Sequence, residues 1–272
     1  MDILVLFTSY NRKSKTIKCI DSLVENNGYD IHFIILDDNS NDGTREALKK
    51  YDNVTVLEGD GNSFYSGGMR QAISYAKKQD LLKYEYVMMI NDDVLFYSNI
   101  IEKLVELSRE SNDGVIVGTT SDSNGNISYG GVVKNSKFRP SFKKIMSPKN
   151  KLIECDTFNA NCVLIPTEIF IKTDNIDKVY THTMGDFDYG LSIKKKGYSI
   201  YASNFMVGVC NNNSINDTWL DTTLSRKIRL QKKEDVKGLP FNEYFHFLNK
   251  NYGLFIAIIY SILPYIRIVF KL

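Results

Sequence analysis

The chain has 272 residues, of which 43% are hydrophobic and 24% are charged, and its formal net charge is +2. This composition is typical of an ordinary globular protein, so we expect one principal domain with a short tail and no nucleic-acid partner. The four cysteines form no close pair, which argues against a zinc site or a disulfide scaffold and favours a reducing, cytosolic compartment. The first residues, 1–7, lack the basic stretch and the length of a secretory signal.

Short apolar runs alternate with helix-like segments along the first third of the chain. The runs predict strands at residues 3–8, 33–36, 54–57 and 86–90. The segments between them predict helices at 44–51, at 68–78 and through the apolar spacing of Ile17, Ile20 and Leu23. This alternation predicts an α/β fold with a mostly parallel central sheet flanked by helices.

The second predicted strand runs directly into the sequence DDNSNDGT, residues 37–44. Its polar side chains therefore lie at the carboxyl edge of the sheet, where open α/β folds bind their ligands. A carboxylate there can accept hydrogen bonds from a nucleobase or a ribose. We interpret Asp38 as a nucleotide ligand and Asp42 as a cap of the following helix.

The fourth predicted strand likewise ends in Asn91, Asp92 and Asp93. If the strands are parallel, these residues share the sheet edge with Asp38. Paired carboxylates suit Mg²⁺ or Mn²⁺, hard ions that take one or two protein carboxylates and complete their shell with water and phosphate oxygens. The sequence therefore predicts a cation site that faces the nucleotide site.

The regular alternation ends after this point. A helix is predicted at 100–108, a strand at 115–118 and a glycine- and asparagine-rich hairpin through 124–131. The Lys-rich range 134–152 is predicted to be an irregular, mobile loop over the edge of the sheet.

Three motifs occur in a characteristic order: TSYNR at 8–12, DDNSNDGT at 37–44, and NDD at 91–93 after an apolar strand. Together they resemble the family 2 glycosyltransferases, and the resemblance extends over roughly residues 1–240. It implies the GT-A fold and Mn²⁺ or Mg²⁺ as cofactor.

The resemblance also implies roles for single residues. Asp38 contacts the base, usually uracil or thymine, and the pair Asp92 and Asp93 holds the diphosphate through the metal. In many members one residue separates this pair, whereas here the two are adjacent, so either can be the direct ligand, and we favour Asp93. The TSYNR motif adds donor contacts: Thr8, Tyr10 and Arg12.

A third acidic motif, in residues 182–198, places Asp186 and Asp188 before a predicted helix that ends near Gly197. A carboxylate there can simply cap the helix. The segment also resembles the family's acidic motif that supplies the general base, which deprotonates the acceptor hydroxyl in an inverting transfer. We assign Asp186 as the base and Asp188 as the alternative and as an acceptor contact. His182 is left outside the metal shell.

Further candidates come from two loops and one aromatic residue. The glycine-rich segment 59–73 leads into a helix whose N-terminus attracts phosphate, and it resembles a donor-bordering segment of rhamnosyltransferase-like members that build bacterial surface glycans. The predicted donor contacts there are Asn62, Gly67 and Arg70. The predicted acceptor contacts in the middle and late parts of the chain are Asn159, Asn161 and Trp219.

The end of the chain is basic and apolar. Residues 223–272 contain nine Lys or Arg against three Asp or Glu, and residues 253–272 are mostly apolar. Pro264 and Arg267 interrupt the apolar run, whereas a spanning helix needs about 20 residues. We predict peripheral contact of this tail with the inner face of the plasma membrane. A helix buried in the core or in a homodimer is the alternative, and KGLP at 237–240 resembles a tail element near the donor diphosphate.

These inferences predict an inverting transfer of sugar from a UDP- or dTDP-sugar to a glycan or lipid-linked glycan acceptor in bacterial surface polysaccharide synthesis. The predicted catalytic domain covers 1–222, with a nucleotide-binding half at 1–95 and an acceptor-binding half at 96–222, and a helical tail follows at 223–272. One alternative, a sugar-phosphate nucleotidyltransferase, would carry a GxGxR-type loop after the first strand, where this chain reads TSYNRKSK. The other, a catalytically inert binding subunit, would lack an effective base, and the presence of Asp186 argues against it.

Overall fold

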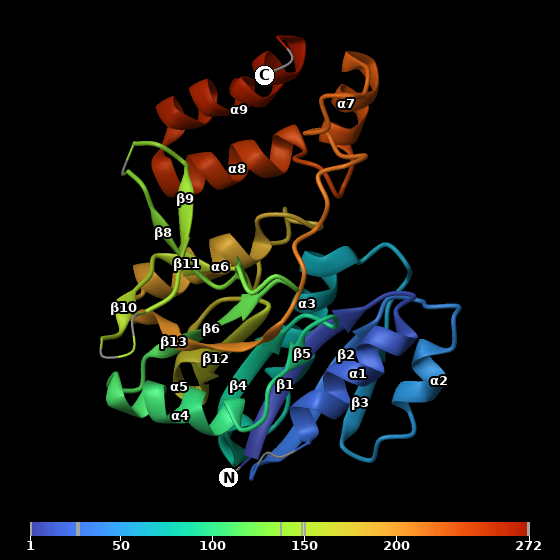
Figure 1. Ribbon diagram of the computed structural model, residues 1–272, viewed down its shortest axis with the longest axis vertical. Helices are drawn as coiled ribbons and strands as arrows, with labels where there is room; N and C mark the ends of the chain where they lie inside the picture. Colours follow the sequence, from blue (N-terminus) through green and yellow to red (C-terminus); the bar gives the residue numbers. More distant parts are fainter. Residues whose placement is uncertain (1, 26–27, 137, 148, 150, 271–272) are drawn as a thin grey trace.

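The computed structural model describes residues 2–25, 28–136, 138–147, 149 and 151–270. Figure 1 shows a central sheet with helices on both faces and three helices beyond one edge of it. The first four strands pair in parallel in the order β3-β2-β1-β4. Their bounds are β1 (Asp2–Ser9), β2 (Asp30–Asp37), β3 (Val54–Glu58) and β4 (Tyr84–Ile90).

The sheet continues beyond β4 with mixed pairing. Strand β12 runs antiparallel to β4 and β6, and β13 runs parallel to β6. Three short strands, β5, β7 and β10, pair antiparallel with these. The bounds are β5 (Leu95–Phe96), β6 (Val115–Ser121), β7 (Ile127–Tyr129), β10 (Ile153–Glu154), β12 (Cys162–Pro166) and β13 (Ile200–Val209). The predicted parallel sheet thus describes the N-terminal half, and the second half is mixed.

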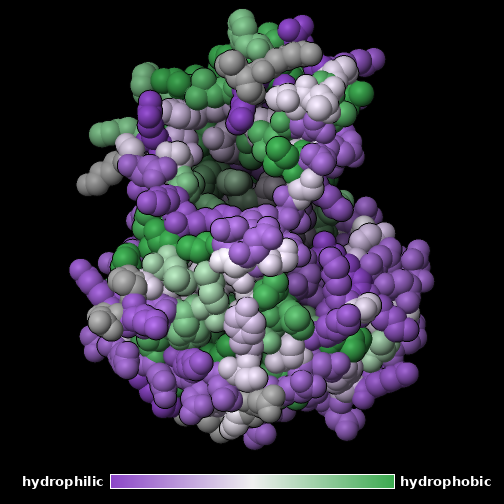
Figure 2. Space-filling view, viewed as in Figure 1, coloured by the Kyte–Doolittle hydropathy of each residue, from purple (hydrophilic) through white to green (hydrophobic). Residues whose placement is uncertain are grey.

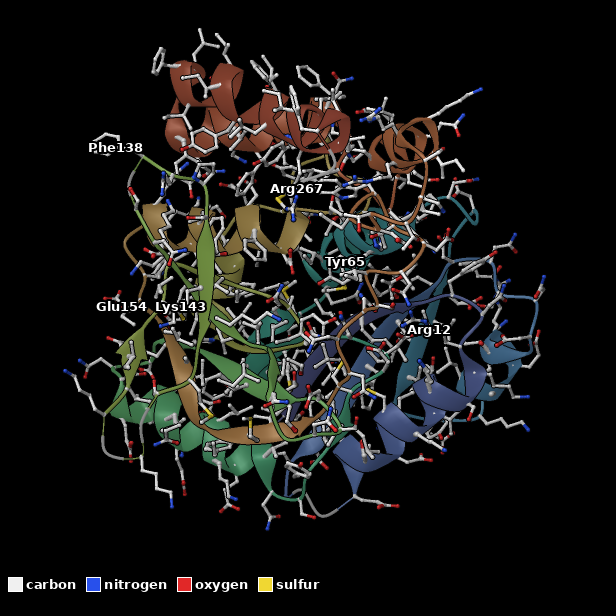
Figure 3. The ribbon with its side chains drawn as sticks, turned by 45° about the horizontal axis from the view of Figure 1, so that its top comes forward. Arg12, Tyr65, Phe138, Lys143, Glu154 and Arg267 are labelled. Carbon is white, nitrogen blue, oxygen red and sulfur yellow. The ribbon has the colours of Figure 1, made fainter. Side chains whose placement is uncertain are left out.

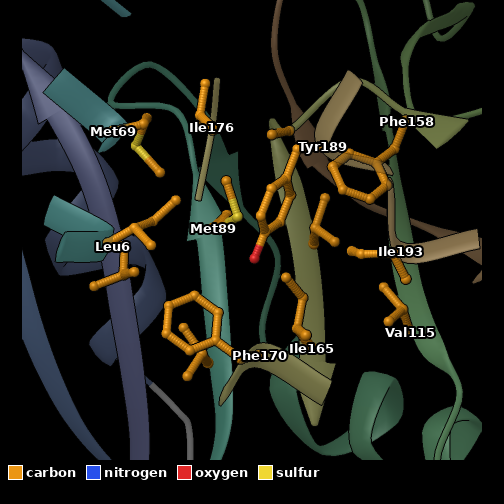
Figure 4. Close-up of a cluster of buried hydrophobic side chains, with 14 of the residues drawn as sticks. Leu6, Met69, Met89, Val115, Phe158, Ile165, Phe170, Ile176, Tyr189 and Ile193 are labelled. Carbon is orange, nitrogen blue, oxygen red and sulfur yellow. The ribbon is translucent and has the colours of Figure 1, made fainter. Parts of the chain in front are cut away.

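Successive residues of β1 enter two different cores because side chains alternate across a strand. Leu4 and Leu6 join the core on one face of the sheet, and Ile3, Val5 and Phe7 join the core on the other. Figure 4 shows the first core around Leu6. Its helices are α3 (Phe64–Ala76), α5 (Thr167–Lys172) and α6 (Gly185–Lys195), with the short turn η1 (Leu81–Lys83); the opposite face carries α1 (Lys13–Val24), α2 (Thr44–Leu48) and α4 (Ile100–Glu110).

The Lys-rich range 134–152 is more regular than predicted. It contains β9 (Phe142–Ile145), which pairs with β8 (Gly131–Lys134) in a three-stranded sheet completed by β11 (Thr157–Phe158). The sequence FKKI lacks alternation, but the Phe142 ring packs 5.0 Å from the ring of Phe187 and holds the strand in place. The prediction of an irregular segment was therefore wrong for β9. Residues 137, 148 and 150 of this range lie outside the described residues.

Three helices form the tail: α7 (Arg226–Glu234), α8 (Phe241–Tyr252) and α9 (Leu254–Val269). Phe247 and Leu248 of α8 and Ala257 of α9 are buried in the same core as α3 and α6. The tail lies beyond the carboxyl ends of β1 and β4 (Figure 1). Figure 2 shows that the surface is hollowed between the tail and the body. Among the described residues, no helix combines the length and the apolar character needed to cross a membrane.

Candidate active site

The carboxyl ends of β1, β2 and β4 meet at one edge of the sheet, because the three strands are parallel neighbours. The last residue of β1, Ser9, pairs with Asp37 at the end of β2. The segments that follow these strands carry Arg12, Asp38 and Asp92, so the three predicted donor residues lie at this common edge. Figure 3 shows Arg12 on the side of the sheet that faces the tail.

Asp38 organises the glycine-rich segment. The side chain is 3% exposed, and its Oδ1 accepts hydrogen bonds from the backbone N–H groups of Gly61 (2.9 Å) and Ser63 (3.3 Å). Its Oδ2 accepts one from the N–H of Phe64, the first residue of α3, at 3.0 Å. A Cβ at Gly59 would lie 2.9 Å from the Asp38 Cα, so glycine is required there. Asp38 therefore shapes the loop at the nucleotide side, and its contact with a base stays a prediction.

The carboxylates of Asp92 and Asp93 both contact the guanidinium of Arg12. The Nη1 of Arg12 donates to Asp92 Oδ1 and to Asp93 Oδ2, at 3.0 Å in both cases. The Asp92 side chain is 6% exposed, and burial raises its pKa although the charge of Arg12 opposes the shift. The Asp93 side chain is 21% exposed. Of the two carboxylates, Asp93 is thus the more accessible to a ligand from solvent.

This carboxylate pair fits a cation whose shell is completed by a diphosphate. Both groups offer the hard oxygen ligands that Mg²⁺ and Mn²⁺ take. The described residues contain no group of three or more His, Cys, Asp or Glu side chains that could hold a metal, so such an ion would need donor oxygens and water. The Cys210 thiol contacts Asp93 Oδ1 at 3.5 Å, and burial together with this carboxylate raises the Cys210 pKa to about 12. A cation at Asp93 would compete with Arg12 for Oδ2.

Asp186 has a different environment. It lies in the first turn of α6, one residue inside the helix and not before it as predicted. Its oxygens accept hydrogen bonds from the N–H groups of Phe187 (2.8 Å) and Ala160 (3.2 Å). Burial raises its pKa to about 6, an effect that these two bonds diminish. In the described part of the chain no cation forms an ion pair with Asp186.

Tyr65 of α3 is a candidate that the sequence did not single out. Its hydroxyl oxygen is buried without a hydrogen-bond partner, and burial and the charge of Asp186 raise its pKa well above the usual value. The hydroxyl therefore stays protonated and close enough to Asp186 to feel its charge. The signal in the sequence was an aromatic residue inside the glycine-rich segment 59–73.

Asp188 joins α6 to the tail. Its Oδ2 accepts a hydrogen bond from Lys250 Nζ at 2.6 Å, and its Oδ1 accepts one from Asn251 Nδ2 at 2.9 Å. Lys250 also contacts Asp177 Oδ2 at 3.2 Å. Because the Asp188 side chain is only 4% exposed, both of its oxygens are committed to α8 in this conformation. This geometry therefore favours a structural role for Asp188, and its alternative role as base or acceptor contact stays a prediction.

Arg70 holds the segment that precedes α6. Its Nη1 donates to the carbonyl oxygens of Asp177 (3.1 Å) and Tyr180 (3.0 Å). Within the same helix, the Gly67 N–H donates to the carbonyl of Thr181 at 3.3 Å. A Cβ at Gly185 would collide with the Ser66 side chain, so α3 and the start of α6 approach each other closely. Arg70 and Gly67, predicted as donor contacts, here brace the loop that carries Asp186.

His182 packs against α3: its carbonyl accepts a hydrogen bond from Ser66 Oγ at 2.8 Å, and its ring centroid lies 6.2 Å from that of Phe64. Burial, together with the cations Lys237 and Arg12, lowers its pKa to about 4, so the ring is neutral near pH 7. Of these two cations, Lys237 lies in the turn between α7 and α8 and Arg12 lies at the sheet edge. The sequence signal for Lys237 was the KGLP segment.

The remaining predicted residues are dispersed. The Thr8 hydroxyl donates to the Leu36 carbonyl at 3.2 Å, Tyr10 is 50% exposed, and Asn62 is exposed. Asn161 is buried against Cys210, and Asn159 has a buried Oδ1 without a partner. Trp219 lines a cavity of about 530 Å³ with residues of α8 and α9 and not with the carboxylates above.

Solved structures of the same architecture include S. aureus TarS, residues 1–349, with a TM-score of 0.58 and 17% identity over 99% of this chain and 81% of that one. A second is the mannosyltransferase PcManGT from Pyrobaculum calidifontis, solved with GDP-Man and Mn²⁺, with a TM-score of 0.57 and 14% identity over 99% of this chain and 74% of that one. These likenesses confirm the predicted GT-A fold.

Residues 4–170 match the family described as glycosyl transferase family 2, and the chain therefore belongs to this family. The match ends before Asp186, so the role of that residue depends on its geometry.

Two curated relatives are similar in sequence. The poly(ribitol-phosphate) beta-glucosyltransferase of Bacillus spizizenii is 26% identical over 72% of this chain and 33% of its own length. The glycosyltransferase GlyG of Streptococcus pneumoniae serotype 4 is 25% identical over 68% of this chain and 62% of its own length. The chain thus spans less than two thirds of either relative.

Proposed function

We propose that the protein is an inverting glycosyltransferase that moves a sugar from a UDP- or dTDP-sugar to a hydroxyl of a glycan or lipid-linked glycan of the bacterial surface. The observation that carries this proposal is Asp186, a carboxylate with a pKa of about 6 at the start of α6, without a paired cation among the described residues. Family membership and the names of the two relatives support glycosyl transfer.

The donor occupies the sheet edge in this proposal. Asp38 and the loop that it organises receive the nucleoside, and Arg12 and Lys237 supply positive charge for the diphosphate. Asp93, with Asp92 beside it, would hold Mn²⁺ or Mg²⁺, which when bound neutralises charge on the departing diphosphate. A neighbour solved with GDP-Man and Mn²⁺ supports a divalent cation in this fold.

The transfer is a single displacement. The acceptor oxygen forms a bond to the anomeric carbon while the bond from that carbon to the diphosphate oxygen breaks, and the electron pair leaves with the nucleoside diphosphate. The hydroxyl proton goes to an Asp186 oxygen, which is ionised above pH 6. The protonated Tyr65 hydroxyl near Asp186 can donate a hydrogen bond to a substrate oxygen in the same region. One displacement inverts the configuration of the anomeric carbon.

Fewer of the predicted side chains are available to contact the acceptor than the sequence indicated. Asn159 has an unpartnered buried oxygen, whereas Asn161 and Asp188 are already bonded within the protein. Similarity to a poly(ribitol-phosphate) transferase supports a surface polymer as acceptor. The same proposal includes a boundary between the catalytic domain and the tail at residues 222 and 223. It also includes a cytoplasmic location and contact of the tail with the membrane.

Calorimetric titration with UDP and dTDP, with and without Mn²⁺, tests the donor half of the proposal. We expect one of the two nucleotides to bind more tightly when Mn²⁺ is present, because Asp93 and the diphosphate share the ion. A transfer assay with the matching UDP- or dTDP-sugars then tests the reaction. If neither nucleotide binds under either condition, the chain is an inert subunit or uses another nucleotide.

A further inference from the structure

The last helix, α9, presents a wide apolar surface to solvent. Between 41% and 75% of each of these large side chains is exposed: Leu254, Phe255, Ile258, Ile259, Ile262, Leu263, Ile266 and Val269. Phe270, directly after the helix, is 68% exposed. Figure 2 shows hydrophobic residues at the tail end of the molecule. Contiguous apolar surface of this kind marks a contact with a membrane or another protein.

The orientation of this surface is set by the fold. The residues of α9 that are buried recur at spacings of three and four: Ala257, Ser261, Pro264 and Ile268. This buried seam lies toward α8, which is itself anchored in the core by Phe247 and Leu248. The exposed apolar face is therefore the side of α9 opposite this seam.

The length of α9 decides how it can meet a bilayer. The helix has 16 residues and contains Pro264, whereas a spanning helix needs about 20 apolar residues. A helix that is too short to span and has one apolar face lies in the interface, with that face at the boundary of headgroups and acyl chains.

The charges around α9 favour an anionic surface. Helix α9 itself contains no Asp or Glu, and Glu234, which the Tyr265 hydroxyl contacts, is paired with Lys233. Helix α7 packs against α9 and exposes Arg226 and Lys227 beside Ile228, which is 40% exposed. Basic residues next to an inserted apolar face add to the affinity for anionic lipid headgroups.

We propose that α9 binds peripherally to an anionic phospholipid bilayer, with its exposed apolar face inserted and the cations of α7 at the headgroups. The charge pattern favours a bilayer over a second copy of the chain. The exposed cations of α7, which packs against α9, suit anionic headgroups, whereas the apolar face alone would suit a second copy equally well. This proposal rests on the proposed function in that it names the helix and the lipid charge for the tail contact included there, and vesicle binding is measured without any sugar transfer, so the two can fail separately.

Co-sedimentation of the full chain with vesicles tests the proposal. We compare vesicles of phosphatidylcholine alone with vesicles that also contain phosphatidylglycerol, and we expect stronger binding to the latter. The variant Phe255→Ser/Ile259→Ser/Ile262→Ser removes three exposed anchors and should lower the partition coefficient at least about a hundredfold. The matched control Leu82→Ser, at an 83% exposed apolar residue far along the chain from α9, should leave it unchanged.

A second variant separates the charge contribution. Arg226→Gln/Lys227→Gln should lower binding to the anionic vesicles about tenfold and leave binding to phosphatidylcholine unchanged. Thermal melts show that each variant keeps its fold. Equal vesicle binding by the wild type and the triple variant would overturn the proposal. A wild type that ignores vesicles but forms a dimer, which the triple variant converts to a monomer, would assign the face of α9 to a second copy instead.

Discussion

Two carboxylate sites near the same edge of the sheet differ in their counter-charge. Asp92 and Asp93 share the guanidinium of Arg12, whereas Asp186 accepts hydrogen bonds from two backbone N–H groups and has no paired cation in the described part of the chain. Burial raises the pKa of both Asp92 and Asp186, but the charge of Arg12 opposes this shift only at Asp92. The first arrangement suits the binding of a cation and a diphosphate, and the second suits a group that must accept a proton near neutral pH.

Replacing the unpaired carboxylate gives the largest expected effect. Asp186→Asn should lower kcat about a thousandfold, because the amide cannot accept the acceptor's proton, and should leave nucleotide affinity unchanged. Steady-state kinetics and calorimetry with UDP and dTDP measure the two quantities. Asp174→Asn, at an exposed carboxylate ahead of α6, is the control and should change neither. Loss of nucleotide binding in Asp186→Asn would move this residue into the donor site.

Replacing the more exposed member of the paired site should act on binding instead. Asp93→Asn keeps the shape of the side chain and removes its charge, so nucleotide affinity in the presence of Mn²⁺ should fall about a hundredfold. Affinity without Mn²⁺ should change much less. Calorimetric titrations with and without the ion measure this difference. An equal loss in both conditions would show that Asp93 acts on the nucleotide without an ion.

The unpaired carboxylate should also cost stability. Folding raises the pKa of Asp186 from 3.8 to about 6, so the folded state binds this proton more tightly than the unfolded state does. The penalty therefore grows as the pH rises from about 4 to about 6 and is complete above that range. Asp186→Asn should raise the free energy of unfolding at pH 8 by about 2 kcal/mol, a value reduced for partial exposure. Urea unfolding at pH 4 and pH 8 checks that the gain appears only at the higher pH.

The pH dependence of transfer gives the smallest expected effect. The base must be ionised, so kcat/KM should fall as the pH drops through about 6 and be roughly tenfold lower at pH 5 than on its plateau. Rates measured between pH 5 and pH 8 give this profile, and nucleotide affinity measured at the same pH values separates binding from proton transfer. A flat profile would remove the distinction between the two carboxylate sites.

Several elements could be predicted from local pattern. The strands β1, β2, β3 and β4 appear as apolar runs bounded by polar residues, and each was predicted within a few residues of its observed bounds. The motifs at 8–12, 37–44 and 91–93 indicated the family, which the match over residues 4–170 confirms. Strand β9 was missed because its partly buried Phe142 is followed by two exposed lysines, and its place depends on contacts with Phe187 and Phe247.

Apolar periodicity and short motifs were enough to determine the α/β class, the family and the sheet edge at which the acidic residues gather, because these features depend on neighbours in the sequence. Only the tertiary structure decided the partner of each carboxylate. Arg12 meets Asp92 across 80 residues of sequence, and Asp188 meets Lys250 across 62. Such contacts depend on the order of strands in the sheet and on the packing of α8 against α6, and no local pattern records either. The same packing turns one face of α9 toward solvent, which its apolar sequence alone does not specify.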